Sequence, residues 1–452
     1  MYISATMPTL PSYIEKAVPN PAANRGPWYK NTAPSYAGIF LWVVFYQTLA
    51  NGTITHASPW FCVLALLVAG ILSYALYYYA PAMLGMKTGY PLYVVGSSTF
   101  GTAGGYLMPG LLMGLLQVGW FAVATFFATQ YILEGFGIKD PHAGTLIFTV
   151  VAVVWGYATG TVGAKGVQYV AKVSQILTVI PALMVLYVFA KTAGGLSSFQ
   201  VTDPNPTAAF NLILASVIGF FATAGAAGAD FGMNARNGND VKLGGIFGIV
   251  VATLYAGALP VLSVAGANGM HPGLGFGYDQ VIGSIGGFGA SVMFFLFAIA
   301  SVVASCFCSF IAGNSFATMI PGVPRIGSSM VAVTVGILLA VTGLASNLLN
   351  VFSLVGASFG PICGAMLADY LLSGGKWAGP RQGINWAGYL AWAVGFVIGI
   401  APLVKAIPDS MKAWDQIAPL YSMIAGFVVY AVVAKLGGQP RAVAMAQPQA
   451  AD

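Results

Sequence analysis

Charged residues are scarce in this chain of 452 residues. Lys and Arg together number 17 and Asp and Glu 11, so that 6% of the chain is charged while 58% is hydrophobic. Soluble proteins carry roughly 25% charged residues, so the composition excludes a soluble globular domain and predicts a polytopic membrane protein. The net charge of +6 does not indicate nucleic-acid binding, because the cations are scattered rather than gathered in a patch.

Cysteine is nearly as rare. The four cysteines are Cys62, Cys306, Cys308 and Cys363, and each lies in an apolar segment. They are typical of small buried hydrophobic residues rather than of disulfides or metal ligands. Cys306 and Cys308 are two positions apart and would point to different faces of a helix, which argues against a metal pair.

The middles of the long apolar runs contain no carboxylate. The acids nearest to these runs stand at their ends: Glu134, Asp140, Asp230, Asp240 and Asp369. The three histidines, His56, His142 and His271, lie in connections. A proton relay needs a titratable group within the membrane, and an enzyme needs a constellation of such groups. We therefore expect no enzyme and no obvious proton carrier.

Nucleotide-binding motifs are also missing. No phosphate-binding glycine loop followed by Lys-Ser or Lys-Thr occurs, so an ATP-driven pump is unsupported. The glycine clusters GAKG (163–166) and GGFG (286–289) have no strand or nucleotide context. We expect no cofactor.

Twelve apolar runs are long enough to cross a bilayer, which takes about 20 residues. They cover 34–54, 60–83, 106–133, 143–164, 167–190, 208–229, 243–265, 288–311, 328–345, 347–372, 386–406 and 416–436. If the N-terminus is inside, thirteen Lys and Arg residues fall in inner segments. Only Lys139, Lys191, Lys405 and Lys412 fall in outer ones. This asymmetry is what the positive-inside rule requires, and it predicts twelve spans with both termini cytoplasmic.

The domain organisation follows from these runs. We expect a cytoplasmic N-terminal segment (1–33), a twelve-helix domain (34–437) and a disordered cytoplasmic tail (438–452). The glycine-rich outer loop 268–287 contains a short apolar segment that could fold back as a lid.

The sixth run changes character at 219–230, GFFATAGAAGAD. Glycine weakens helices, and in a bilayer an unwound backbone survives only where protein or a water-filled cavity satisfies it. The first run has a comparable polar break at 51–53, Asn-Gly-Thr. Breaks five spans apart suggest two inverted five-helix halves, 34–190 and 208–372, whose broken helices meet at a central binding site, with 386–436 as two additional helices. The alternative is a small-residue face for helix packing.

Polar and aromatic residues in two other runs point to ligands. Trp120, far from either membrane interface, offers a flat face for stacking on a planar ring, or is a core-packing residue. Ser301, Ser305 and Ser309 share one helix face. They could contribute oxygen ligands to sodium, or form interhelical hydrogen bonds.

Several segments resemble the nucleobase–cation symporter family, and most closely its cytosine permease branch. They are GMKTGYP (85–91), QVGWFAV (117–123), FFATAGAAGADF (220–231), FGPICGAMLADYLL (359–372) and INWAGYLAW (384–392). The resemblance runs from about residue 25 to 437. It implies an all-α, leucine-transporter-like fold of twelve helices with a five-plus-five inverted repeat and broken helices 1 and 6. It also implies import of a nucleobase by cation-coupled symport across the inner (plasma) membrane.

The resemblance assigns roles by position. Trp120 would stack on one face of the base and Phe221, nine residues before Asp230, would flank the other. Substrate contacts are also expected from Phe220, Gln47, Thr223 and Gly225. Sodium, favoured over a proton, would bind carbonyls around Phe45 and Thr48 with the hydroxyls of Ser301 and Ser305. The gate and its structural supports would include Asp230, Arg236, Gly360, Pro361 and Asp369.

Two departures from the family pattern bear on these expectations. The eighth span reads Val303-Ala304-Ser305 where the family has neighbouring threonines and then an asparagine, which weakens the sodium assignment. Only Arg236 remains of the basic pair after the sixth span. Ala124, a small residue four positions after Trp120, fits the cytosine branch better than the hydantoin carriers. Two alternatives stay open: the cargo could be another heterocycle, such as a hydantoin, a purine or a pyrimidine vitamin precursor, or, less favourably, the protein could be a channel. The oligomeric state also stays open.

Overall fold

The computed structural model describes residues 10–165, 177, 179–404 and 417–445, and the regular elements among these residues are helices, with no named strand. Parts of predicted spans five, eleven and twelve, and the ends of the N-terminal segment and tail, lie outside the described residues.

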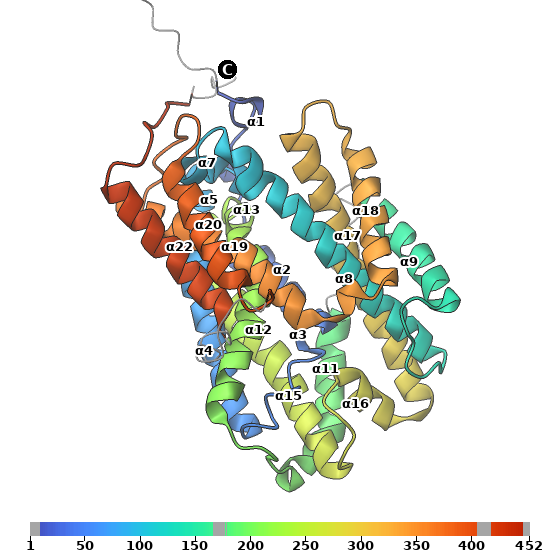
Figure 1. Ribbon diagram of the computed structural model, residues 1–452. Helices are drawn as coiled ribbons and strands as arrows, with labels where there is room; N and C mark the ends of the chain where they lie inside the picture. The colour runs from blue at the N-terminus through green and yellow to red at the C-terminus, as the bar shows by residue number, and fades with distance from the viewer. Residues whose placement is uncertain (1–9, 166–176, 178, 405–416, 446–452) are drawn as a thin grey trace, which may run out of the picture.

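The described residues contain nine helices that are long and apolar enough to cross a membrane, and two shorter apolar helices, Arg325–Val341 and Trp386–Ile400; with the broken first span, twelve segments result (Figure 1). In chain order they are α2 (Thr32–Phe40) with α3 (Val43–Tyr46); α4 (Pro59–Leu72) with η3 (Ser73–Tyr78) and α5 (Tyr79–Thr88); η4 (Gly104–Tyr106) and η5 (Leu107–Leu111) with α8 (Leu112–Gly135); α9 (Leu146–Lys165); α11 (Val179–Thr192); α12 (Pro206–Ala226) with α13 (Gly228–Gly232); α14 (Gly238–Gly245) with η7 (Ile246–Val251) and α15 (Ala252–Met270); α17 (Gly287–Met319); α18 (Arg325–Val341); α19 (Leu348–Leu372); α20 (Trp386–Ile400); and α22 (Ala418–Lys435). The predicted number of spans is confirmed.

The shorter elements lie in the connections: α1 (Ser12–Glu15), η1 (Ala22–Asn24), η2 (Trp28–Lys30), α6 (Leu92–Val95), α7 (Ser97–Phe100), η6 (Ala193–Ser198), α16 (Tyr278–Ile285) and η8 (Leu344–Ser346). We call the end of the bundle that carries α1 and residues 436–445 the terminal face, and the end that carries α16 the distal face (Figure 1).

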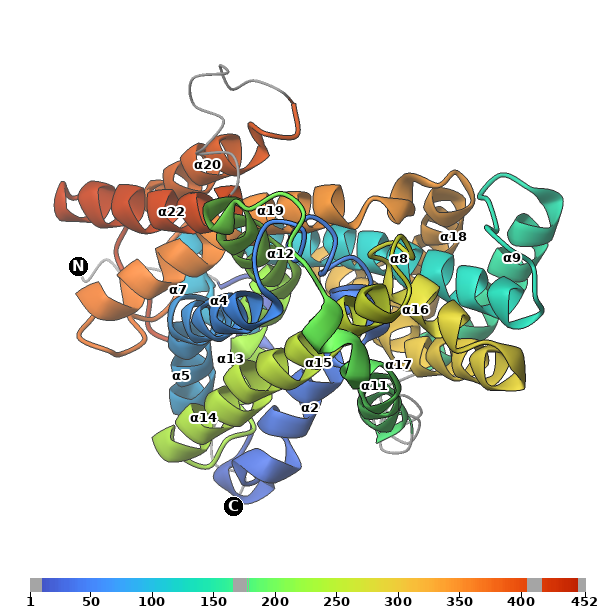
Figure 2. The ribbon, with the colours of Figure 1, turned by 90° about the horizontal axis from the view of Figure 1, so that it is seen from below.

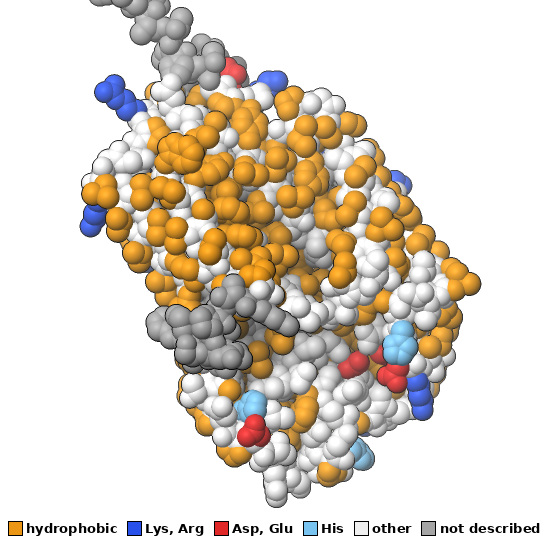
Figure 3. All heavy atoms as spheres, viewed as in Figure 1, with side chains coloured by type: hydrophobic (Ala, Val, Ile, Leu, Met, Phe, Trp, Pro, Cys, Tyr) orange, Lys and Arg blue, Asp and Glu red, His pale blue; other side chains and the backbone are white. Residues whose placement is uncertain are grey.

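The spans form two packing groups (Figures 1 and 2). α17 packs on α8, α9 and α18. α12 packs on α4 and α19, while α15 packs on α4 and α11. α19 also packs on α20 and α22. Hydrophobic side chains cover the middle of the molecule, and Asp, Glu and His side chains gather towards the distal face on the side that Figure 3 shows. This distribution fits a bilayer around the bundle.

The first span is broken earlier than predicted. α2 ends at Phe40 and α3 begins at Val43, so the interruption lies at Leu41 and Trp42, whereas residues 47–57 form turns beyond the helix. The expected break at 51–53 was therefore the end of the span, with Gly52 at φ 71°. Leu41 and Trp42 are not helix-breaking residues, so the break is imposed by what this segment packs against.

The sixth span is interrupted later than predicted. α12 remains helical through Gly219 and Gly225 to Ala226, and only Ala227 separates it from α13. A Cβ on Gly219 would lie 2.6 Å from the Phe352 carbonyl oxygen, and one on Gly225 would lie 2.6 Å from Cβ of Tyr77. These glycines therefore allow close helix packing, and the prediction of an unwound backbone across them was wrong.

The first and last described segments of the chain pack against the terminal face. The Tyr13 hydroxyl donates a hydrogen bond to the Thr102 carbonyl oxygen at 2.7 Å. In the tail, the backbone N–H of Val443 donates to the Pro380 carbonyl oxygen at 2.7 Å. This part of the predicted disordered tail thus has a backbone partner. The division into halves at 34–190 and 208–372 stays a prediction.

Candidate functional site

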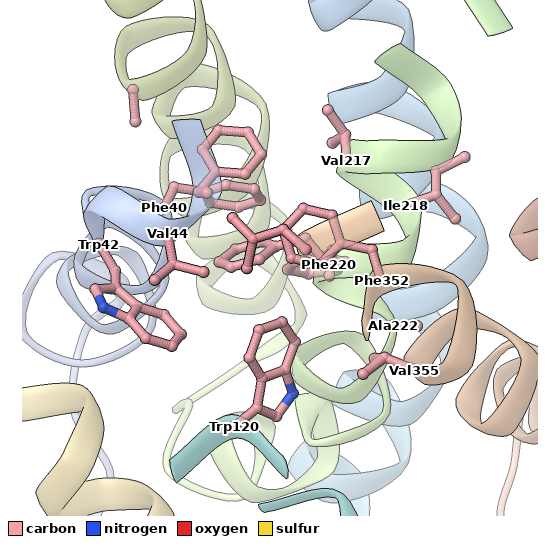
Figure 4. Close-up of a cluster of buried hydrophobic side chains, with 14 of the residues drawn as sticks. Phe40, Trp42, Val44, Trp120, Val217, Ile218, Phe220, Ala222, Phe352 and Val355 are labelled. Carbon is pink, nitrogen blue, oxygen red and sulfur yellow. The ribbon is translucent and has the colours of Figure 1, made fainter. Parts of the chain in front are cut away.

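Four aromatic side chains from four spans meet where the first span is broken (Figure 4). The ring centroids of Trp120 and Phe220 are 5.5 Å apart, and those of Trp42 and Trp120 are 5.7 Å apart. Phe352 of α19 lies 5.5 Å from Phe220 and 6.0 Å from Trp120. All four side chains are buried. We call these four residues the aromatic cluster, and its flat faces are suited to a planar ligand.

The plane of Trp120 is fixed by a polar contact. Its indole Nε1 donates a hydrogen bond to Oγ1 of Thr223 at 3.2 Å, and both residues are buried. Thr223 stands one helical turn after Phe220, so α12 supplies both the neighbouring ring and the hydrogen-bond partner. Gly225 instead lies against Tyr77, within the helical part of α12.

Phe220, rather than Phe221, is the neighbour of Trp120. The Phe221 ring stacks on Phe40 with centroids 5.5 Å apart and planes 9° apart, and lies 5.6 Å from Tyr36. Successive residues of a helix point about 100° apart, so the two phenylalanines face different neighbours. A flanking role for Phe221 stays a prediction.

Gln47 lies outside the aromatic cluster, at the distal end of the first span. Its Oε1 accepts a hydrogen bond from the Tyr131 hydroxyl at 2.5 Å, and its carbonyl oxygen accepts one from the backbone N–H of Tyr278 at 3.0 Å. Tyr278 begins α16, so the glycine-rich outer loop does pack back over the first span, as expected.

Two carboxylates share one amide beside Gln47. Nε2 of Gln130 donates to Oε1 of Glu134 at 2.9 Å and to Oδ2 of Asp279 at 3.1 Å. Burial raises the pKa of the Asp279 carboxyl, although a hydrogen bond from Gln47 opposes the shift. We call Gln47, Gln130, Tyr131, Glu134 and Asp279 the distal latch, because they join span one, span three and α16.

Two of the three serines on the predicted face of the eighth span donate within their own helix, whereas Oγ of Ser309 donates to the Gly160 carbonyl oxygen of α9 at 2.8 Å, as the alternative of an interhelical hydrogen bond predicts. Oγ of Ser301 donates to the Phe297 carbonyl oxygen, and Oγ of Ser305 donates to the Ser301 carbonyl oxygen, each at 3.1 Å. The Thr48 carbonyl oxygen accepts from the backbone N–H of Asn51 at 3.0 Å. The Phe45 ring packs 5.0 Å from the ring of Phe220. The described residues contain no group of three or more His, Cys, Asp or Glu that could hold a metal, and the sodium site stays a prediction.

The predicted gate residues lie towards the terminal face. Asp230 accepts from the backbone N–H of Leu92 at 3.0 Å, and Arg236 pairs with Asp240 at 2.9 Å. Asp369 forms a buried ion pair with Arg381 at 3.2 Å. Oδ2 of Asp369 also accepts from the hydroxyls of Ser98, at 2.7 Å, and Thr99, at 3.2 Å.

Gly360 and Pro361 occupy a packing contact in α19. A Cβ on Gly360 would lie 3.1 Å from the Pro419 carbonyl oxygen. Pro361 fills the space beside Gly395 and Gly426, where an added Cβ would meet it at 2.5 and 2.6 Å. Both residues therefore position α19 against the last two spans.

Sequence reasoning missed several residues of these clusters. Trp42 lies mid-run like Trp120, and a search for every aromatic residue far from the interfaces would have found it. Phe352 stands near the start of its run, 347–372, and that search would have passed over it. Gln130, Tyr131 and Asp279 carry no such signal, because a tertiary contact alone joins them to Gln47.

Comparisons with known proteins agree with this architecture. Residues 18–428 match the family described as "Permease for cytosine/purines, uracil, thiamine, allantoin". The cytosine permeases of Escherichia coli K12 and of Escherichia coli O157:H7 are each 27% identical over 327 residues, which cover 70% of this chain and 73% of those proteins.

Solved structures share the fold. Mhp1, a nucleobase-cation-symport-1 family transporter, in a closed conformation with bromovinylhydantoin bound, superposes with a TM-score of 0.68 at 15% identity, covering 93% of this chain and 95% of Mhp1. Inward-facing Mhp1 gives 0.67 at 17% identity, covering 96% of each chain. A Na⁺-coupled sialic acid symporter gives 0.58 at 15% identity, covering 94% of this chain and 92% of that chain. The family match spans most of the chain, and the protein therefore belongs to the membrane permease family for cytosine, purines, uracil, thiamine and allantoin, which are transporters and not enzymes.

Proposed function

We propose that the protein imports a nucleobase, cytosine or a similar planar heterocycle, by cation-coupled symport and alternating access. The observation that supports this most directly is the aromatic cluster at the broken first span, with Trp120 oriented by Thr223. Aromatic side chains stack on every base because every base has a π-face. The named activity of the cytosine permeases supports the choice of cargo.

In this proposal the base stacks on Trp120 and displaces the Phe220 ring from its edge-on contact at an interplanar angle of 80°. The hydrogen bond to the Thr223 hydroxyl holds the Trp120 indole in its orientation, and this hydroxyl would face the edge of the bound base. Phe221 supports the opposite wall through Phe40, and Gly225 keeps α12 close to the second span. Gln47 would not touch the cargo, and would act through the distal latch, which closes over the bound cargo.

We propose sodium as the coupling cation in preference to a proton. The ligands would be the carbonyl oxygens of Phe45 and Thr48 and the hydroxyl oxygens of Ser301 and Ser305, which can accept a cation while donating along their helix. Cargo and cation need only favour the same conformation for their fluxes to be coupled. The terminal face would lie in the cytoplasm of a cell whose inner (plasma) membrane holds the protein, because most of the described Lys and Arg residues belong to the segments at that end.

The test is uptake of radiolabelled cytosine into proteoliposomes with sodium and proton gradients imposed separately. We expect saturable accumulation that follows an inward sodium gradient. Accumulation driven only by protons would overturn the coupling proposal. Flux that neither saturates nor depends on a cation gradient would overturn symport in favour of a channel.

A second cargo class deserves the same assay, because the structurally similar Mhp1 was solved with bromovinylhydantoin bound. A competition panel of cytosine, uracil, a purine and a hydantoin against labelled cytosine ranks the cargos. If a hydantoin competes more strongly than unlabelled cytosine, the proposed cargo changes from cytosine to a hydantoin.

A further inference from the structure

An apolar groove of about 410 Å³ runs between α11 and α17 in the distal half of the molecule. Leu183 and Tyr187 form one wall, and Phe288, Val292 and Leu296 form the other. Positions 288 to 296 span roughly 12 Å of α17 at the rise of an α-helix. None of the residues that line the groove belongs to the aromatic cluster, so it is separate from the proposed cargo site.

The groove exists because its two helices belong to different packing groups. α17 packs mainly on α8, α9 and α18, whereas α11 packs mainly on α15. The two helices lie side by side when the molecule is seen from below (Figure 2). Side chains at such a seam do not interdigitate fully, and in a membrane the remaining space is filled by lipid.

Positive groups stand at the distal mouth of this groove. Lys191 follows Tyr187 by one helical turn, and its Nζ lies 5.6 Å from the Tyr187 ring centroid. Lys191 is exposed and forms no ion pair with any carboxylate of the described chain. Its charge is therefore available to a ligand that approaches along the groove.

The second positive group is the N-terminus of α17, a helix of 33 residues that has no side-chain cap. The first amides of a helix have no partner within the helix, and they carry the positive end of its dipole. Gly286, Gly287 and Gly289 surround this end, and a Cβ on any of them would meet nothing within 4 Å. The GGFG sequence thus leaves the amides open to an anion beside the exposed Phe288.

We propose that this groove binds a phospholipid with an anionic headgroup. One acyl chain would lie along Tyr187, Val292 and Leu296, and the headgroup phosphate would meet Lys191 and the first amides of α17. An apolar groove leading to two positive groups at the level of the headgroups matches this amphipathic ligand and no soluble anion. A lipid bound in the groove would stabilise the contact between α11 and α17, and so between the two packing groups.

The test measures lipid binding to the detergent-purified full-length protein by native mass spectrometry, and it does not depend on transport. Phosphatidylglycerol and phosphatidylcholine with identical acyl chains are compared. We expect phosphatidylglycerol to bind roughly fivefold more tightly, as one lysine–headgroup contact provides near a membrane surface. Lys191→Ala should remove this preference. The matched control Lys139→Ala, another exposed distal lysine, should retain it.

Val292→Trp fills the groove at a lipid-facing position and should lower the affinity for both lipids. Equal binding of the two lipids to the unmodified protein would overturn the proposal. So would an undiminished preference in Lys191→Ala, or undiminished binding of both lipids in Val292→Trp. Inorganic phosphate could also compete as effectively as the lipid does. This result would show that the positive groups bind an anion without using the groove, and it would overturn the proposal as well.

Discussion

At the scale of single residues, the aromatic cluster depends on the orientation of a few side chains. The indole of Trp120 donates a hydrogen bond to Thr223, and its ring lies beside those of Trp42 and Phe220. No main-chain group of α12 between Phe220 and Gly225 is released by unwinding, since this stretch is helical. Recognition of a ring must therefore rely on side-chain faces more than on backbone hydrogen bonds.

Replacing Trp120 with alanine should lower cytosine uptake by about fivefold to 150-fold, because base–aromatic stacking contributes roughly 1–3 kcal/mol. Membrane insertion should be unchanged, as measured by the amount of monodisperse protein extracted from the membrane. Trp120→Phe, which keeps a flat face, is the control and should retain part of the uptake. Ordinary kinetics in Trp120→Ala would remove this residue from the cargo site.

The two neighbouring phenylalanines should separate binding from stability. Phe220→Leu should raise the KM for cytosine severalfold with little change in Tm, because its ring borders Trp120. Phe221→Leu should lower Tm with a smaller effect on KM, because its ring is stacked on Phe40. Thermal unfolding and uptake kinetics of both variants check the assignment, and the reverse pattern would restore Phe221 as the stacking residue.

At the scale of elements, α16 closes the distal face by contacts with spans one and three. The latch places two carboxylates on the single amide of Gln130, and Asp140 adds further negative charge beside both. No ion pair to either carboxylate occurs in the described residues. Closure is therefore expected to depend on pH.

The sign follows from Asp279, whose pKa is raised by burial in the closed arrangement. A raised pKa means that the closed arrangement binds the proton more tightly. Closure is then most favourable below the pKa of the solvated carboxyl, and this contribution is lost as pH rises through the raised value. Spin labels on His142→Cys and Gln280→Cys should report a longer mean distance at high pH than at low pH.

The distance measurement is feasible because the four native cysteines are buried. Asp279→Asn should hold the latch closed and weaken the pH dependence, whereas Asp203→Asn, an exposed acid on the same face, should leave it intact. A distance that does not change with pH in the unmodified protein would refute this role of Asp279.

At the scale of the whole molecule, one buried ion pair connects distant parts of the chain at the terminal face. Asp369 of α19 joins Arg381, which donates to the Ser98 carbonyl oxygen at 2.9 Å and to the Gln439 side chain at 3.0 Å. The tenth span, the connection after the second span and the tail are thus held together. Removing one partner leaves an uncompensated buried charge.

Asp369→Asn should therefore destabilise the protein by about 3–5 kcal/mol, measured as loss of Tm and of resistance to proteolysis in detergent. Asp203→Asn provides a comparison, because the Asp203 side chain is 77% exposed beside His56. That change should cost less than about 1 kcal/mol. Equal losses in the two variants would contradict a structural role for the buried pair.

The sequence by itself determined the class of protein, the number of spans and the family. Scarce charge and long apolar runs leave no alternative to a membrane bundle, since every backbone polar group must be satisfied inside the bilayer. The glycines of α12 could not be interpreted from the sequence, because unwinding and close packing require the same residue. The tertiary structure decided that Gly219 and Gly225 face Phe352 and Tyr77.

The tertiary structure also decided where the first span breaks and which phenylalanine faces Trp120. Leu41 and Trp42 have no intrinsic reason to leave a helix, and adjacent residues differ by about 100° in direction. Both outcomes depend on contacts between spans that are far apart in the sequence, and so do the pairing of Gln47 with Tyr131 and of Gln130 with Asp279. Composition and motifs specify which groups a membrane protein has, whereas packing specifies which of them meet.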